Sequence, residues 1–363
     1  MGSKRYLFVI PTLSNGGAER VISVLSSALA RKDREVYVVK YYSTINEYPV
    51  DVRVRVIDLS GGDISEYERI SYFEKVKRLR AIINKYKPDY IIPFMFQVSL
   101  CTSISAWGIR TNVIQSIRIN PASGPSTKIK RAIRDYLVYR AKCTFVQNQS
   151  QKEYFRASHH GKIHVLFNPV SEELLEASWT PRQNSYIVCG VGRLENQKNF
   201  KLLMDSFKAA YSEVPEAVLR IYGEGSQGAE LRTYAEILEM GGRIQMMGRC
   251  NDIKSVYQSA SLFILSSDFE GMPNALIEAM AVGTPCISTD CPTGPADLIS
   301  DGKNGLLVSV NDKDAMVQAM RQMYERRNDL RGMSEAAKET IRSLCSSNQI
   351  AQRMIDICER IEG

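Results

Sequence analysis

Short apolar runs alternate with amphipathic segments along the whole chain. Runs of strand length, such as Tyr6 to Ile10 and Ala217 to Tyr222, precede segments in which apolar residues recur at helical spacing. This alternation predicts parallel sheets whose strands are joined by crossover helices. In the first half we expect strands at 6–10, 36–41, 54–59, 90–96, 112–117, 144–147 and 162–167, with helices at about 18–30, 66–86, 99–107, 126–141 and 149–156.

The same alternation continues in the second half of the chain. We expect strands starting at 186 and spanning 217–222, 244–247, 260–265 and 285–288, with helices starting at 200 and 275 and spanning about 229–238, 314–326 and 334–362. Between the halves, an Asn-Pro turn at Asn168 is followed by the polar segment 171–185, which indicates a linker. A chain of 363 residues is long enough for two domains.

The composition is that of a folded soluble protein, with 44% hydrophobic and 24% charged residues. Lys4 and Arg5 precede only a strand-length run, so we expect no signal peptide, and no apolar stretch approaches the roughly 18 residues of a membrane span. Eight cysteines without a C-x-x-C pair indicate reduced core residues, and three histidines provide no metal-ligand cluster. These features favour a cytoplasmic protein.

Charge is distributed unevenly along the sequence. Residues 1–170 carry 27 Lys and Arg against 13 Asp and Glu, whereas residues 171–363 carry 20 against 27. Many of the basic residues lie in the helical segment 126–142, where Ile129 and Tyr136 share an apolar face and Arg134 belongs to the polar side. This pattern fits a peripheral contact with an anionic membrane surface and fits equally well an ordinary helix packed on its own domain. Nucleic-acid binding is disfavoured, because aromatic and basic residues do not interleave there.

Two carboxylates bracket a predicted strand-to-helix turn at 266–283. Glu270 follows the apolar run 260–265, and Glu278 lies about two turns into the helix that begins after Pro273 and ends at Gly283. Ligands of open α/β sheets bind at this carboxyl edge, so we interpret the stretch as an active site. The simpler alternative is a helix whose positive end is stabilised by Glu270, with Glu278 as a solvated residue.

Glycines and cations mark two other strand ends. Arg193 and Lys198 follow the strand that starts at 186, and a pair of cations beside a helix N-terminus can neutralise a diphosphate. Gly16 and Gly17 follow the first strand and could let a phosphate approach the backbone, although a tight turn explains them too.

Two motifs of other protein classes also occur. Residues 223–228 spell G-x-G-x-x-G, but in mid-chain, so we do not interpret them as a dinucleotide site. Residues 312–314 spell D-x-D, which we interpret as a helix cap.

The spacing from Glu270 to Glu278 with its flanks resembles the E-x7-E signature of the family 4 glycosyltransferases, and the segment from Arg193 to Lys198 is similar to that family's G-R-x4-K motif. The resemblance implies an α/β GT-B fold, in which two Rossmann-like domains with parallel sheets face a central cleft. The implied domains are 1–170 for the acceptor and 171–340 for the nucleotide sugar, with the helical segment 341–363 returning to the first domain.

The resemblance further implies a retaining hexosyltransferase that uses a UDP-sugar donor and needs neither metal nor cofactor. In that family Arg193 and Lys198 would hold the diphosphate, Glu278 the ribose, Glu270 the donor sugar, and Gly16 with Gly17 would close on the phosphates. Main-chain groups would complete the donor site at these positions: Arg249, Gly271, Met272, Pro273 and Asn274. The region of the family's usual histidine holds Ser116, Arg118 and Asn120 instead. Arg118 and Asn120 are candidates for the acceptor site, although Arg118 could also face the donor, and an ordinary surface-loop arginine explains it equally well.

The basic first half and the segment 126–142 suggest a lipid-linked saccharide acceptor at the inner face of a bacterial cytoplasmic membrane, as in O-antigen, capsule or exopolysaccharide synthesis. Two alternatives remain. A UDP-sugar epimerase shares the two-domain architecture and would consume donor without an acceptor. A non-catalytic sugar-nucleotide-binding module is disfavoured by the presence of Glu270, Glu278, Arg193 and Lys198 together.

Overall fold

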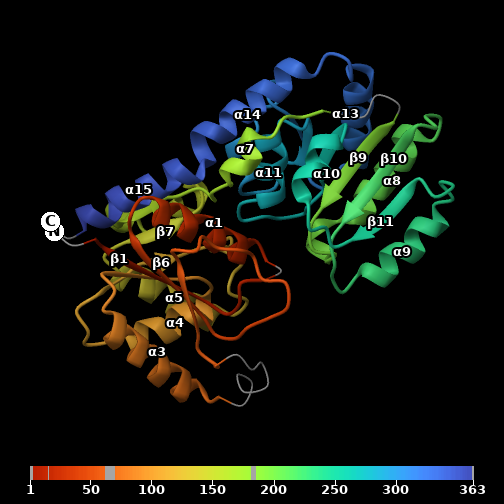
Figure 1. Ribbon diagram of the computed structural model, residues 1–363. Coiled ribbons are helices and arrows are strands. Elements are labelled where there is room, and N and C mark those ends of the chain that lie inside the picture. The colour runs from red at the N-terminus through yellow and green to blue at the C-terminus, as the bar shows by residue number, and fades with distance from the viewer. Residues whose placement is uncertain (1–2, 15, 62–69, 181–184, 362–363) are drawn as a thin grey trace. The chain divides into compact units, whose positions relative to one another are not determined.

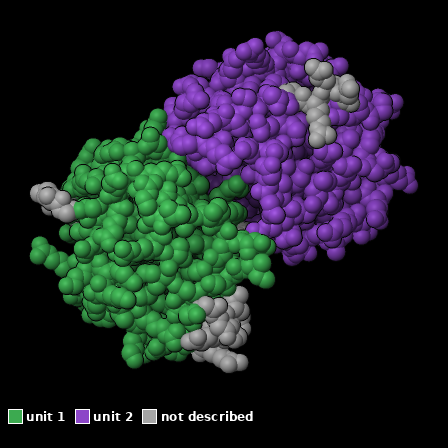
Figure 2. Space-filling view, in the orientation of Figure 1, with its two compact units in different colours: residues 1–169, 347–363 green, residues 170–346 purple. Residues whose placement is uncertain are grey.

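The computed structural model describes residues 3–14, 16–61, 70–180 and 185–361 (Figure 1). The chain forms two compact units, coloured separately in Figure 2. Unit 1 comprises Met1–Pro169 and Ser347–Gly363, and unit 2 comprises Val170–Ser346. The last segment of the chain therefore belongs with the first unit.

Unit 1 is built on a parallel sheet of five strands in the order β3-β2-β1-β4-β5. These strands are β1 (Arg5–Ile10), β2 (Glu35–Lys40), β3 (Arg55–Asp58), β4 (Tyr90–Pro93) and β5 (Asn112–Val113). A second parallel sheet contains β6 (Gln115–Ser116), β7 (Thr144–Val146) and β8 (Ile163–Val165).

The strand expected at 112–117 is thus two strands, because the chain changes partner at Ile114. The Ile114 N–H donates to Ile91 O of the first sheet, and the next N–H, that of Gln115, donates to Cys143 O of the second. The strand expected at 90–96 is also shorter, because helix α4 already begins at Phe96.

Helices cover both faces of the five-stranded sheet, because successive side chains of a strand point to opposite faces and both sets are apolar here. The helices of unit 1 are α1 (Gly17–Arg31), α3 (Tyr72–Tyr86), α4 (Phe96–Ser105), α5 (Lys128–Arg140), α6 (Gln149–Glu153) and α15 (Ser347–Arg360), with the 3-10 helix η1 (Ala157–Lys162). Tyr6, Phe8 and Ile10 of β1 pack with α1 and α15, whereas Leu7 and Val9 pack with α3 and α4.

Helix α3 begins at Tyr72, and the predicted helix start at 66 lies outside the described residues. Ser71 caps it, because its hydroxyl accepts from the Glu74 N–H at 3.2 Å.

Helix α5 differs from its expected packing. Arg134, assigned by the sequence to the polar side, is 4% exposed, and its guanidinium pairs with Asp135 at 2.6 Å and donates to the carbonyls of Pro121 and Gly124. Ile129 and Tyr136, expected on one apolar face, are 75% and 63% exposed. Ile133 and Leu137 of the same face are partly buried, so the described residues cover this face only in part.

Unit 2 contains a parallel sheet of six strands in the order β11-β10-β9-β12-β13-β14. They are β9 (Tyr186–Val191), β10 (Ala217–Tyr222), β11 (Ile244–Gly248), β12 (Leu262–Leu265), β13 (Cys286–Thr289) and β14 (Leu306–Val308). Its helices are α7 (Glu172–Glu176), α8 (Phe200–Tyr211), α9 (Gly228–Ile237), α10 (Ile253–Ser259), α11 (Asn274–Val282), α12 (Pro295–Leu298), α13 (Lys313–Glu325) and α14 (Arg331–Cys345), with η2 (Asn196–Lys198) a single 3-10 turn.

Two expectations for this half of the chain were wrong. The helix expected at 334–362 is two helices, α14 and α15, because the chain becomes extended at Ser346, where Val170 forms a parallel bridge. The expected linker at 171–185 contains α7, whose Leu174 and Leu175 are buried. The D-x-D segment does cap a helix, since the Asp312 carboxylate accepts from the Ala315 N–H at 2.9 Å.

Candidate active site

The two loops that carry most of the candidate residues meet because their strands are neighbours. Strand β9 pairs in parallel with β12, so the carboxyl ends of both strands lie at the same edge of the sheet. Residues 192–199 follow β9, and residues 266–273 follow β12. The sheet topology therefore brings the loop of Arg193 and Lys198 next to Glu270, which lies 72 positions after Lys198 in the sequence.

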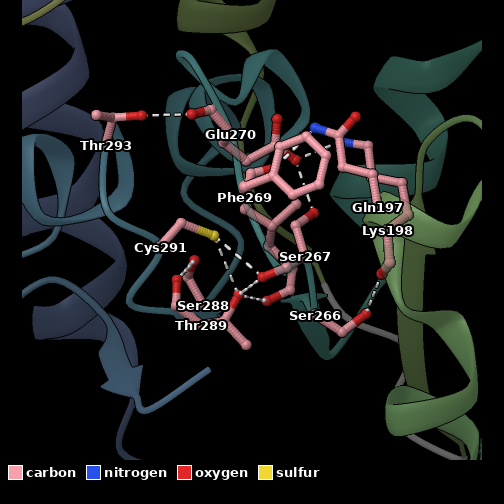
Figure 3. A network of polar contacts seen from close by, with 11 residues as sticks. Gln197, Lys198, Ser266, Ser267, Phe269, Glu270, Ser288, Thr289, Cys291 and Thr293 are labelled. Atoms are coloured by element: carbon pink, nitrogen blue, oxygen red, sulfur yellow. Dashed lines mark hydrogen bonds and ion pairs between the residues drawn. The ribbon is translucent and has the colours of Figure 1, made fainter. Parts of the chain in front are cut away.

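Polar bonds join the two loops directly (Figure 3). The Gln197 side-chain amide donates to the Phe269 carbonyl at 2.6 Å, and the Asp268 N–H donates to the Gln197 carbonyl at 2.9 Å. The Ser266 hydroxyl donates to the Lys198 carbonyl at 2.8 Å. These contacts fix the backbone on both sides of Lys198 and Glu270.

Lys198 and Glu270 form an ion pair at the centre of these loops. The Lys198 ammonium lies 2.6 Å from Glu270 Oε1, and the two side chains are only 15% and 8% exposed. The Ser267 hydroxyl donates to the same carboxylate oxygen at 2.6 Å. A shielded pair of this kind is strongly coupled, because few waters screen its charges.

The end of the next strand, β13, supports the Glu270 loop from the other side. The Thr289 hydroxyl and the Cys291 thiol both donate to the Ser267 carbonyl, at 2.6 and 3.0 Å, and Thr293 donates to the Glu270 carbonyl (Figure 3). Burial raises the pKa of Cys291 to about 11, so its thiol keeps the proton that it donates. Contacts from the ends of three neighbouring strands, β9, β12 and β13, thus fix the main chain around Glu270.

Glu278 lies on α11 and is 5% exposed, so it is not the solvated helix residue of the simpler alternative. The hydroxyl of Tyr257, on helix α10, lies 3.3 Å from Glu278 Oε2. Gly283 ends α11 in the left-handed conformation, with φ of 88°, as the sequence predicted.

The G-x-G-x-x-G turn packs against the loop that carries Arg193. A Cβ on Gly223, whose φ is +143°, would lie 1.8 Å from the Gly192 carbonyl oxygen. The Gln227 N–H donates to the Leu194 carbonyl at 2.9 Å. Gly223 and Gln227 therefore pack this turn closely against the backbone of the Arg193 loop.

The other donor-site candidates of unit 2 lie around this centre. Arg193 is exposed, and within the described ranges its side chain has no hydrogen bond or ion pair. Met272 and Pro273 are buried at the start of α11, so they can contribute mainly main-chain groups, whereas Gly271 and Asn274 are partly exposed. Arg249 directly follows β11, two strands away from β9.

The remaining candidates belong to unit 1. Gly16 precedes α1, and the carboxylate of the buried Glu19 packs against it, so an acidic group lies beside the turn that was expected to approach a phosphate. Arg118 follows β6 and is partly buried. The Asn120 side chain accepts from the Ala122 N–H at 2.9 Å and so supports its own turn.

Several contributors were missed by the sequence analysis. Ser267, Thr293 and Gln197 act through single bonds to the Glu270 loop, and Tyr257 lies 21 positions before the Glu278 carboxylate that it contacts. Hydroxyl and amide side chains are common in loops, so the local sequence did not distinguish these four residues from other loop residues. Asn199 could have been predicted as a helix cap, because it has φ of 45° and caps α8, and asparagine is enriched both at helix N-caps and at positive φ.

Neither a metal-ligand cluster nor a membrane-spanning helix occurs among the residues that the structure describes. No three His, Cys, Asp or Glu side chains of these residues gather as metal ligands would. No helix within the same residues has the length and apolar character that crossing a membrane requires.

Two family models match this chain almost end to end. Residues 15–174 match the model described as Glycosyltransferase Family 4, and residues 171–340 match the model described as Glycosyl transferases group 1. The chain belongs to the family 4 glycosyltransferases.

Named relatives extend the likeness over most of this glycosyltransferase. It is 28% identical over 337 residues, covering 92% of both chains, to the GalNAc-alpha-(1->4)-GalNAc-alpha-(1->3)-diNAcBac-PP-undecaprenol alpha-1,4-N-acetyl-D-galactosaminyltransferase of Campylobacter jejuni. It is 25% identical over 346 residues, covering 92% of this chain and 93% of the relative, to the amylovoran biosynthesis glycosyltransferase AmsD of Erwinia amylovora.

Solved structures show that this glycosyltransferase has the GT-B fold. HepE of Anabaena, crystallised with UDP, superimposes with a TM-score of 0.78 at 16% identity, covering 99% of this chain and 100% of HepE. Sucrose-phosphate synthase of Thermosynechococcus elongatus gives a TM-score of 0.81 at 18% identity, covering 99% of each chain.

Proposed function

We propose that this glycosyltransferase moves a hexose or N-acetylhexosamine from a UDP-sugar to a lipid-linked saccharide during synthesis of a cell-surface polysaccharide, with retention of the anomeric configuration. The observation that carries the proposal is the shielded Lys198–Glu270 pair at the carboxyl ends of β9 and β12, beside the exposed cation of Arg193. Family membership supports the reaction class, and HepE, a GT-B neighbour, was crystallised with UDP.

The two cations suit departure of a nucleoside diphosphate. As the bond to the sugar breaks, negative charge grows on the leaving diphosphate, and fixed cations stabilise that charge without reorganising. Lys198 is neutralised by Glu270 before the donor arrives, so an incoming diphosphate shares the ammonium with that carboxylate. Arg193, which has no ion pair among the described residues, supplies the second cation. Because these side chains take over charge stabilisation, we propose that transfer needs no metal ion.

The other donor contacts follow from the same edge of the sheet. Glu278, aligned by Tyr257, would accept hydrogen bonds from the ribose hydroxyls. Main-chain groups of Gly271 to Asn274 would meet the donor sugar, and those of Arg249 the base. Gly16 and Gly17 of unit 1 would approach the phosphates, where the Glu19 carboxylate would have to move aside.

A lipid-linked acceptor is supported by the surface of unit 1. Ile129 and Tyr136 of α5 are exposed among basic residues, and Phe73 of α3 and Trp107 beyond α4 are 78% and 80% exposed in the same unit. Exposed aromatic and basic side chains together favour the surface of an anionic bilayer. The name of the Campylobacter relative gives a PP-undecaprenol saccharide as its acceptor. We therefore propose peripheral association with the inner face of the cytoplasmic membrane.

The donor proposal is tested by saturation-transfer NMR with UDP, a panel of UDP-sugars and NAD against the wild type and Lys198→Ala. We expect a UDP-sugar to bind in preference to NAD and to lose affinity in the variant. Binding of NAD alone would refute the proposal. Conversion of the bound UDP-sugar to an isomer in the absence of any acceptor would instead support an epimerase. Turnover in the presence of EDTA tests whether transfer is independent of metal.

The membrane proposal is tested by co-sedimentation with vesicles containing anionic phospholipid. The double variant Ile129→Asp/Tyr136→Ser should sediment less, and salt should release the wild type because it screens the attraction. The matched control is Ile237→Asp, which changes a residue 66% exposed on α9 of unit 2. Equal sedimentation of all three proteins, or indifference to salt and lipid charge, would contradict the proposal.

A further inference from the structure

Arg118 is a cation that the fold positions without neutralising. Its Nε donates to Ser116 Oγ at 2.7 Å, and its Nη1 donates to Asn168 Oδ1 at 2.9 Å. The guanidinium lies over the ring of Phe94, 4.4 Å from the ring centre. All three partners are uncharged, and no ion pair within the described part of the chain includes Arg118.

The neutral partners are themselves held in place. The Asn168 carbonyl oxygen that accepts from Arg118 also accepts from the Gln147 side-chain amide at 2.9 Å. Asn168 and Gln147 are 3% and 2% exposed, and Gln151 accepts from the Gln147 N–H at 2.8 Å. The guanidinium is therefore fixed by a buried scaffold while its charge remains uncompensated.

Burial also changes the acid–base character of this group. It lowers the pKa of Arg118 to about 9, so the side chain stays cationic at neutral pH but has lost part of its hydration. A partly desolvated cation gains when an anion binds, because little water must be displaced and few waters screen the attraction.

A structural arginine of the same unit is treated differently. Arg134 has a carboxylate partner, Asp135, at 2.6 Å and donates to backbone carbonyls as well. Arg118, in contrast, has only uncharged partners among the described residues.

The surroundings of Arg118 also favour an anion. Helix α4, ten residues long, begins two residues after Phe94, and its N-cap Met95 provides no side-chain hydrogen bond. The N-termini of α5 and α6, by contrast, are capped by Thr127 and Asn148. Uncapped first-turn N–H groups and the helix dipole add positive potential near the ring on which Arg118 lies.

We propose that Arg118, with the N-terminus of α4, forms an anion subsite in unit 1 that takes a phosphoryl group of a substrate. The inference rests on the proposed function, which supplies two such groups: the diphosphate of the lipid-linked acceptor and the diphosphate of the donor. The same contacts would serve either, since a planar guanidinium pairs with phosphate oxygens in both.

The subsite is tested by calorimetric titration of inorganic pyrophosphate and of UDP into the full-length protein. Pyrophosphate is titrated in the presence of saturating UDP, which occupies the cations Arg193 and Lys198. The variants are Arg118→Gln, Arg118→Lys, and the matched control Arg110→Gln, which changes an exposed arginine of the same unit. Unfolding midpoints of all variants establish that they fold.

If the acceptor supplies the group, UDP-loaded wild type and Arg110→Gln bind pyrophosphate, and Arg118→Gln binds it about 10- to 100-fold more weakly, as for loss of a charge-assisted hydrogen bond. If the donor supplies it, Arg118→Gln weakens UDP by a similar factor. Arg118→Lys, which keeps the charge without the planar fork, loses less in either arm. Unchanged affinity for both ligands in Arg118→Gln overturns the subsite, whereas a wild type that binds no UDP overturns the proposed function.

Discussion

Replacing Lys198 with methionine removes the ammonium that neutralises Glu270 and keeps a side chain of similar length. The ammonium lies 2.6 Å from the carboxylate, and the two side chains are 15% and 8% exposed. Removing one partner of a shielded pair leaves a desolvated charge, which costs about 3–5 kcal/mol of the free energy of unfolding. The Ser267 hydroxyl still donates to the carboxylate, so we expect the lower end of that range.

A double-mutant cycle separates this coupling from other effects. Lys198→Met and Glu270→Gln each break the pair, whereas the combined variant leaves no unpaired charge. We expect the combined loss of stability to be smaller than the sum of the single losses by about 1–3 kcal/mol. Urea unfolding can be followed by Trp179 of unit 2 in a Trp107→Phe background, because Trp107, the other tryptophan, is exposed in unit 1.

Activity gives the second readout of the same variants. If Lys198 stabilises the leaving diphosphate, Lys198→Met should lower kcat by about 10²- to 10³-fold, as for loss of one preorganised charge-stabilising donor. The combined variant should regain stability but not activity. A coupling below about 0.5 kcal/mol together with unchanged turnover would refute the reasoning, since neither the ion pair nor the leaving-group role would then survive.

Three further changes test other parts of the structure. Tyr257→Phe removes the hydroxyl that lies 3.3 Å from the Glu278 carboxylate. It should lower the free energy of unfolding in urea by about 1–2 kcal/mol and raise the KM for the donor. An unchanged KM would contradict the proposed role of Glu278 at the ribose. Gly223→Ala should lower the free energy of unfolding by more than about 2 kcal/mol, because its Cβ would meet a carbonyl oxygen at 1.8 Å. The control Gly241→Ala, at φ +57° in open space, should lower it by about 1 kcal/mol. Equal losses of stability in the two variants would contradict the packing argument. Burial, with the charges of two nearby basic residues, lowers the pKa of His164 below 6.5. The unfolded chain therefore binds the proton more readily than the folded protein, and the free energy of unfolding should fall as the pH is lowered through about 6.5. His164→Gln should flatten that part of the pH profile of urea midpoints, and an unaltered profile would contradict this reasoning.

Much of the site could be predicted from the sequence because its residues occupy fixed places relative to strand ends. Arg193 and Lys198 follow one apolar run, and Glu270 follows another. In a parallel sheet all such positions fall on one edge, so the strand pattern alone indicated where the site lies. The pattern could not show that Lys198 and Glu270 pair directly, because that contact spans 72 positions and depends on which strands are neighbours.

The sequence by itself determined the alternation of strands and helices, the two halves of the chain, the helix ends at Gly283 and Asp312, and the loops that carry the candidate chemistry. These features follow from local preferences: side-chain periodicity, capping and backbone conformation act over a few residues.

Only the tertiary structure decided the remaining features. The segment expected as one strand at 112–117 is divided between two sheets, and the helix expected at 334–362 is interrupted at Ser346. Arg134 is buried, and Ile129 is exposed. Each of these depends on what the rest of the chain presents at that point: a second sheet, a bridging strand, or carbonyls that can accept from a guanidinium. Such partners come from distant segments, and the free energy of contacting them outweighs the local preference of the residue itself.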